Sequence, residues 1–320
     1  MYQDSKLFLN QAVIKDWEEH YAEVFGKHIL LLQHSLHELP IFREENLERL
    51  IEGCPTKYYD FVKMGKQGEH KKSWRRGSIK DVKGSDVLSA IEKGRFWLSL
   101  QSLQEWDDTL KAVVDHIFDD FSEKVPGFKP YKLKLGMLIS SPNAQVYYHC
   151  DLPAQSLWQI KGEKDVYIYP NSEPFLSDQE LEPIFLGKSE EEISFQPWYD
   201  QFASKTTLKP GEMTHWPLNG PHRVENHDCM NISVTTSHFT DEVRNFYAQT
   251  YANGLLREMG FNPKRNSAGL TKYSKIALAA GHKFVYNKFF AKPKSPKAPM
   301  DFTVDLSASD LMKNIEPISM

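Results

Sequence analysis

Apolar residues recur along the first 125 positions at two different spacings. Four segments repeat apolar side chains every three or four residues, as the buried face of a helix requires: residues 12–25, 42–53, 85–94 and 103–125. Two shorter segments, residues 27–36 and 95–103, carry apolar runs that indicate strands. We therefore expect residues 1–125 to form an N-terminal helix and strand region that packs on a larger core.

The spacing changes after Pro126. Between residues 131 and 239, short extended runs alternate with Gly, Pro and Asn turn signals, a pattern typical of a β-sandwich or β-barrel. Helical spacing returns over residues 242–260 and 270–290, and a stretch rich in Pro and Lys follows. The sequence therefore predicts a β core over residues 126–240 and a C-terminal helical region and tail over residues 241–320.

Composition narrows the class of protein. The chain of 320 residues is 40% hydrophobic and 12% aromatic, which is enough for a large core and too apolar for a disordered chain. No apolar run approaches the roughly 18 residues of a membrane span, and the N-terminus has no signal-like core. Three scattered cysteines favour a reduced, cytoplasmic setting without disulfides.

Charge is unevenly distributed around a net value of −4, which does not favour binding to nucleic acid. Residues 259–300 contain nine Lys or Arg and no Asp or Glu. This segment is either an ordinary solvated surface or one that faces an anion or a partner. Residues 69–81, with four cations around Trp74, have no periodicity and are expected to form a loop.

One short stretch concentrates chemistry-bearing side chains. His149 and Asp151 are two residues apart, so both side chains point to the same side of a strand while Cys150 faces away. Downstream, His215 and His222 each offer a further imidazole. Two histidines and one carboxylate on one face of a metal suit non-haem Fe(II) and leave positions open. An His-x-Asp pair alone is a weak signal and also occurs at ordinary polar strand ends.

The surrounding residues strengthen that signal. The segments HCDLPAQSLWQIKGEKDVYIYP (149–170) and LKPGEMTHWPLNGPHRV (208–224) resemble the metal-binding core of the JmjC/cupin-like family of Fe(II)- and 2-oxoglutarate-dependent oxygenases. Within that family they are similar to the asparaginyl hydroxylases typified by factor inhibiting HIF. Glu212 stands where the family pattern has Asp. The resemblance implies a double-stranded β-helix core of the jelly-roll type, mainly β with flanking helices.

The resemblance also implies roles for individual residues. His149, Asp151 and His222 match the iron ligands, and Lys164 matches the basic residue that pairs with the distal carboxylate of 2-oxoglutarate. His215 falls inside the preceding strand and is expected to be a packed histidine near the site. Val146 replaces a hydroxyl residue that often touches the cosubstrate. Candidates for that contact and for substrate contacts are Thr235, Tyr147, Tyr148, Ser99, Gln101, Gln155, Trp158 and Trp216.

These residues lead to one preferred function and two alternatives. We expect an oxygenase that uses Fe(II), 2-oxoglutarate and O2 to hydroxylate a peptide side chain or a small metabolite. The ligand Asp151 argues against a halogenase, whereas demethylation and related oxidations stay open. The alternatives are a non-catalytic cupin-like binding protein and a Zn²⁺- or Ni²⁺-binding regulatory protein. The C-terminal helices are expected either to form a homodimer interface or to pack back on the core.

Overall fold

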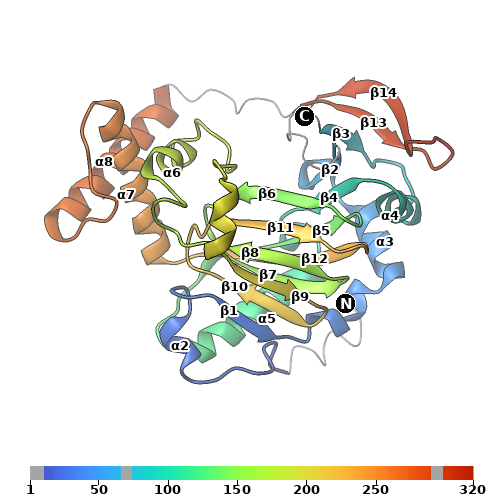
Figure 1. Cartoon of the computed structure of the whole chain (residues 1–320), viewed down its shortest axis with the longest axis horizontal. Helices are drawn as coiled ribbons and strands as arrows, with labels where there is room; N and C mark the ends of the chain where they lie inside the picture. Colours follow the sequence, from blue (N-terminus) through green and yellow to red (C-terminus); the bar gives the residue numbers. More distant parts are fainter. Residues whose placement is uncertain (1–10, 66–73, 290–297, 320) are drawn as a thin grey trace.

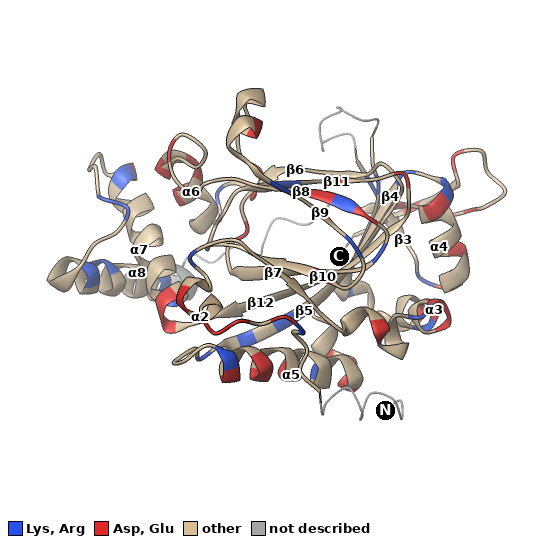
Figure 2. Ribbon diagram, turned by 60° about the horizontal axis from the view of Figure 1, so that its bottom comes forward, with Lys and Arg blue, Asp and Glu red and all other residues tan. Residues whose placement is uncertain are grey.

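The fold is described by a computed structural model that covers residues 11–65, 74–289 and 298–319, with the side chains of 286–289 left aside. Two β-sheets form the centre of the molecule. Their strands are ordered β1-β10-β7-β12-β5-β4-β2-β3-β13-β14 in a ten-stranded sheet and β6-β11-β8-β9 in a four-stranded sheet. In Figure 2 the small sheet lies over the large one, and the long helix α5 lies beneath the large sheet.

Eight consecutive strands make the central barrel-like unit. They are β5 (Tyr131–Ser140), β6 (Gln145–His149), β7 (Ala154–Lys161), β8 (Lys164–Ile168), β9 (Ser204–Leu208), β10 (Glu212–His215), β11 (His222–Asn226) and β12 (Asn231–Phe239). Their antiparallel pairs are nested: β8 pairs with β9, β7 with β10, β6 with β11 and β5 with β12. A long hairpin rolled up in this way between two facing sheets is a double-stranded β-helix, the jelly-roll core that the sequence predicts.

The connection between β7 and β8 shows why this hairpin folds back where it does. Gly162 has a φ of +79°, and a Cβ atom there would lie 2.4 Å from the carbonyl oxygen of Met230. Only glycine satisfies both the left-handed backbone and this close approach without strain. The turn leaves Lys161 exposed and turns Lys164 into the interior.

The N-terminal region extends the large sheet and covers its outer face. Strands β1 (Leu30–Gln33), β2 (Tyr59–Lys63), β3 (Arg75–Ser78) and β4 (Phe96–Leu100) join it, with helices α3 (Glu44–Gly53), α4 (Gly84–Lys93) and α5 (Asp108–Lys124). Short elements complete the region: α2 (Tyr21–Val24), η1 (Leu36–Glu38), η2 (Pro40–Phe42), η3 (Thr56–Tyr58) and η5 (Leu103–Glu105). One hydrophobic core contains residues from Val13 to Phe302, so this region and the barrel pack as one unit.

Two expectations for this region are wrong. Of the helix expected over residues 12–25, only α2 forms, because Ile14 instead bridges His34 and the backbone N–H of Lys15 donates to Gln33. Within the expected loop 69–81, the described part contains strand β3, whose Arg76 forms a buried ion pair with Asp60 at 2.7 Å. Residues 69–73 of that expected loop lie outside the described residues.

The C-terminal region contains α7 (Asp241–Glu258) and α8 (Gly269–Phe289), packed side by side at one end of the molecule (Figure 1). Helix α6 (Asp178–Phe185) packs against α7, and η6 (Pro197–Phe202) precedes β9. The chain ends in a hairpin, β13 (Met300–Val304) and β14 (Met312–Ile318), which extends the large sheet next to β3. The expected C-terminal helices are present, and the expected tail contains this hairpin. No helix among the described residues combines the length and apolarity needed to cross a membrane.

Candidate metal and cosubstrate site

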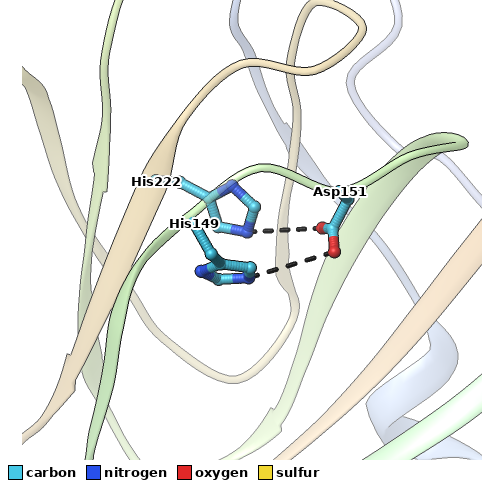
Figure 3. Close-up of side chains that lie close together, drawn as sticks. All are labelled: His149, Asp151 and His222. Atoms are coloured by element: carbon cyan, nitrogen blue, oxygen red, sulfur yellow. Dashed lines mark ion pairs between the residues drawn. The ribbon is translucent and has the colours of Figure 1, made fainter. Parts of the chain in front are cut away.

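Three side chains meet where strands β6 and β11 lie side by side. His149 is the last residue of β6 and pairs directly with His222, the first residue of β11, while Asp151 follows β6 by two residues. The Nε2 atom of His149 lies 3.9 Å from Oδ1 of Asp151, and that of His222 lies 3.4 Å from Oδ2 (Figure 3). Candidate ligand atoms of all three residues lie within 4.8 Å of one another, so residues 73 positions apart converge on one point.

Hydrogen bonds orient both imidazoles toward that point. Nδ1 of His149 lies 2.8 Å from the carbonyl oxygen of Tyr147, and Nδ1 of His222 lies 3.0 Å from that of Gly220. A carbonyl only accepts, so each Nδ1 carries the proton and each Nε2 presents a lone pair beside Asp151. Burial lowers the pKa of His222 to about 4, which keeps this ring in the neutral form that binds metals.

The position of Asp151 is fixed through its backbone. The buried side chain of Asn219 donates from Nδ2 to the carbonyl oxygens of Asp151, at 2.5 Å, and Leu152, at 3.3 Å. Asn219 lies in the β10–β11 connection with a φ of +56°, a conformation that asparagine tolerates better than most residues. The loop that precedes His222 therefore holds the carboxylate as well as the second histidine.

A cavity of about 350 Å³ opens onto the three ligand candidates and extends between the two sheets. Lys164 also lines it, from the far end of the small sheet: Lys164 pairs with Asn226, whereas His222 pairs with Ile168. The Lys164 side chain is 3% exposed, and no carboxylate contacts it among the described residues. Burial lowers the pKa of its ammonium to about 7. An ammonium buried in a cavity needs an anionic partner to remain charged.

Most of the other predicted site residues also line this cavity. They are Ser99, Gln101, Tyr147, Gln155, Trp216 and Thr235. The Trp216 ring lies 4.7 Å from that of His222, between centroids. Tyr148 does not line the cavity, because it packs on the outer face of the small sheet against Tyr169 and Tyr199.

Trp158 is a correction to the predicted set. Its side chain is fully buried on the opposite face of the large sheet, where Nε1 donates to Oγ1 of Thr236 at 2.9 Å and the ring packs near Phe121. Its neighbour Leu157 points into the cavity instead, because successive residues of a strand face opposite sides. Trp158 therefore builds the core and has no contact with the site.

His215 also faces away from the three ligand candidates. It stacks on Phe25 at 4.3 Å between ring centroids, and its Nδ1 lies 2.9 Å from Oγ of Ser156. The expectation of a packed, hydrogen-bonded histidine is correct, but this residue lies in the layer outside the large sheet and not beside the metal position. Burial lowers its pKa to about 4, so it is a neutral core residue.

Several cavity residues were not predicted. Trp74 and Trp97 form one wall, with ring centroids 6.2 Å apart, and Asn226 lies beside Lys164 and donates to Oγ of Ser140 at 2.8 Å. Glu191 and Glu192 reach the cavity because their segment bridges His149 and accepts the N–H of Cys150. Only the tertiary fold brings these residues to the site, and no local motif marks them.

The donor set fits a divalent transition metal. Two neutral imidazole nitrogens and one carboxylate oxygen on one side of a point are the ligands of non-haem Fe(II) sites, and they leave the side toward the cavity open. Zn²⁺ also accepts such ligands. The buried Lys164 cation in the same cavity distinguishes the two, because a purely structural metal site has no need of a separate anion-binding group.

Comparisons with known proteins concern the fold. No protein-family model matches the sequence, and no curated protein matches it. The X-ray structure of Escherichia coli ycfD matches with a TM-score of 0.50 and 14% identity, over 87% of this chain and 70% of that chain. A structure of YcfD, a ribosomal oxygenase from Escherichia coli, in complex with cobalt and 2-oxoglutarate, has a TM-score of 0.48 and 14% identity over 89% and 74% of the two chains. The chain therefore has the fold of ycfD, which confirms the double-stranded β-helix expected from its resemblance to JmjC/cupin-like oxygenases.

Proposed function

We propose that the protein is an Fe(II)- and 2-oxoglutarate-dependent oxygenase that hydroxylates a peptide side chain or a small metabolite. One observation carries the proposal. The two imidazoles and the carboxylate converge at one end of a cavity, and the same cavity is lined by a buried ammonium that has no carboxylate partner among the described residues. A short dicarboxylate that binds a metal at one end and a lysine at the other explains both features.

Each residue has a defined part in this reaction. His149, Asp151 and His222 would hold iron, and Lys164 would bind the distal carboxylate of 2-oxoglutarate. The iron would supply redox chemistry with O2, in which one oxygen atom enters the substrate C–H bond and the other enters succinate as CO2 leaves 2-oxoglutarate. Thr235 and Tyr147 line the cavity as candidate contacts to the cosubstrate.

The two strand positions suit a short dicarboxylate. Lys164 and Ile168 are four residues apart on β8, and Ile168 is level with His222. At about 3.3 Å per strand residue, this offset is about 13 Å between Cα atoms. Lys164 and His222 both point into the cavity from the same face of the small sheet. A ligand that binds both the metal position and Lys164 must therefore be short, as 2-oxoglutarate is.

The remaining cavity wall would position the substrate. Gln101, Gln155 and Trp216 offer two amides and an aromatic face. A cavity of about 350 Å³ is at the small end of ligand sites, so beside 2-oxoglutarate it has room for one side chain or a small metabolite. Leu157 and Val224 give part of the wall an apolar surface.

The test is the O2-dependent conversion of 2-oxoglutarate to succinate. We expect purified protein with Fe(II) to form succinate even without its substrate, slowly, and Asp151→Ala to form none. Wild-type protein that forms no succinate, under conditions in which a known oxygenase of this class does, contradicts the proposal.

We also propose that two copies of the chain associate through α8, and that the protein is cytoplasmic. The support for a dimer is an exposed apolar stripe on this helix, in which Leu270 is 86% exposed and Tyr273 is 67% exposed. The stripe continues to Ala277 at helical spacing. The small side chain of Ala277 permits the close approach of a second, antiparallel helix.

A further inference from the structure

A second cavity, of about 470 Å³, lies away from the proposed active site. It is bounded by α7, α8 and the neighbouring ends of β5 and β12. None of its lining residues lines the cavity with the three ligand candidates. Its floor consists of aromatic and small apolar side chains: Tyr131, Phe239, Tyr247, Ala248, Ile276, Ala279 and Ala280.

The rim of this cavity is cationic. Lys132, Arg244 and Lys283 line it, and none of the lining residues that the structure describes is Asp or Glu. The acid that contacts the rim among the described residues is Asp241, whose Oδ1 lies 3.2 Å from Nη1 of Arg244, with both side chains exposed. Such an exposed pair contributes little and leaves the cavity with an excess of positive charge.

Within the described part of the chain, the two lysines have aromatic neighbours and form no ion pair with a carboxylate. Nζ of Lys283 lies 4.5 Å from the ring centroids of Tyr247 and Tyr251, and Nζ of Lys132 lies 5.4 Å from that of Phe239. Both lysines line the same cavity, and partial burial together with the nearby charge of Lys132 lowers the pKa of Lys283. An anion bound near both ammonium groups would offset their like charges.

Lys132 and its neighbour Tyr131 lie at the edge of this cavity. The φ of Lys132 is +53°, an uncommon backbone conformation for a lysine, at the start of β5. The adjacent Tyr131 ring stacks near Phe239 at 6.4 Å between centroids, and its hydroxyl donates to the carbonyl oxygen of Thr240. The Tyr131 ring is therefore oriented by a ring contact and a hydrogen bond beside the cationic side chains.

We propose that this cavity binds an anion attached to a flat apolar body, such as an aromatic carboxylate or phosphate. The apolar body lies on Phe239 and Tyr247 and against the small side chains of α8, where Ala279 and Ala280 leave room. The anionic group lies between Lys132 and Lys283. This site is separate from the proposed oxygenase function and does not depend on it.

Isothermal titration calorimetry of the full chain tests the proposal with three probes of one shape. These are 2-naphthoate, 2-naphthyl phosphate and the neutral 2-naphthalenemethanol. We expect at least one of the two anions to bind with one-to-one stoichiometry, and the neutral probe to bind about tenfold more weakly or worse. A preference between the anions identifies the ligand as a carboxylate or a phosphate.

Substitutions in and near the cavity test whether the probes bind there. Lys132→Gln/Lys283→Gln should weaken the anion about tenfold or more, and Ala280→Trp should abolish binding of all probes by filling the cavity. Lys272→Gln, which changes a lysine of α8 outside the lining, is the matched control and should bind as wild type does. Circular dichroism confirms that each variant is folded.

Lys164→Met separates this site from the proposed active site and should leave binding unchanged. Three results overturn the proposal: no anion binds, the neutral probe binds as tightly as the anions, or binding is lost in Lys164→Met and kept in Lys132→Gln/Lys283→Gln.

Discussion

At the scale of single residues, two hydrogen bonds determine which atoms of the site face a cation. The Nδ1 protons of His149 and His222 are held by backbone carbonyls, so both Nε2 lone pairs face Asp151. Without a metal, these lone pairs and the carboxylate are three acceptors close together, an arrangement that gains stability when a cation binds. The ligand atoms are therefore oriented toward one point before a metal binds.

Replacing one of these ligands should therefore remove metal binding and leave the fold intact. We expect Asp151→Ala and His149→Ala each to weaken Fe(II) binding about 100-fold or more, measured by anaerobic calorimetry, since even supporting residues of metal sites contribute about 10- to 100-fold. His20→Ala, at a histidine 65% exposed, is the control. Unchanged affinity in the ligand variants would show that iron binds elsewhere.

Lys164 allows a second test at the residue scale. Its charge should attract the distal carboxylate of 2-oxoglutarate, so we expect Lys164→Met to weaken cosubstrate binding about 10- to 100-fold. Lys161→Met changes an exposed lysine on the other side of the same turn and should bind as wild type does. Equal loss in both variants would mean that the effect is not specific to the buried ammonium.

The affinity for 2-oxoglutarate should also depend on pH. With its pKa lowered to about 7, Lys164 is charged below that pH and increasingly neutral above it. Because only the ammonium attracts the carboxylate, affinity should begin to fall as the pH rises above about 7, and Lys164→Met should lose this dependence. An affinity that rises through the same range in wild-type protein would contradict the assignment.

At the scale of elements, the sequence predicts where strands and helices occur better than it predicts which side chains of a strand point into the cavity. Strand β7 is buried on both sides, by the cavity on one face and by α5 and its neighbours on the other. Leu157 and Trp158 are successive apolar residues, so no alternation of apolar and polar positions distinguishes Leu157, which lines the cavity, from Trp158, which does not. The failure over residues 12–25 has a similar cause, since Trp17, Tyr21 and Phe25 pack at helical spacing without a continuous helix.

The C-terminal hairpin could not be predicted because its partner is remote in sequence. Strand β13 pairs in parallel with β3, more than 220 residues earlier, and Phe302 packs against both Phe61 and Phe96. Arg75 and Asp301 form an ion pair at 3.1 Å between the two strands. Local patterns contain no information about such pairings, so the segment was expected to be a tail.

The hairpin should nevertheless contribute strongly to stability. Phe302 is fully buried, so we expect Phe302→Ala to lower the free energy of unfolding by about 3 to 5 kcal/mol, measured by urea denaturation. Ile318→Ala, in the partner strand at a side chain 43% exposed, should change it by much less. A similar small change for both variants would mean that the hairpin is not part of the core in solution.

At the scale of the whole molecule, the site depends on the jelly-roll topology. The nested pairing places β6 beside β11, and this alone brings His149 and Asp151 to His222. The sequence predicts all three residues through their motif, but it cannot predict the walls supplied by Trp74, Trp97 and Glu191, which come from separate segments. Metal ligands can be predicted from the sequence because few residue types can bind a metal. The cavity walls accept many residue types, and only the tertiary fold shows which residues form them.

Association through α8 is testable at this scale. We expect the wild-type protein to have about twice its chain mass of 37.1 kDa by light scattering, and Leu270→Glu/Tyr273→Glu to be monomeric because acids on a self-facing stripe repel one another. Leu306→Glu, at an exposed apolar residue of the C-terminal hairpin, is the control and should remain dimeric. A wild-type mass of one chain at all concentrations would contradict the proposed dimer.

We propose that His149, Asp151 and His222 would together hold one ferrous ion and that Lys164 would bind the distal carboxylate of 2-oxoglutarate. The visible absorption spectrum under argon measures this directly. Addition of Fe(II) and then 2-oxoglutarate to wild-type protein should produce a weak charge-transfer band that saturates at one equivalent of iron. Its absence from the wild type, or its persistence in Asp151→Ala, would contradict the account.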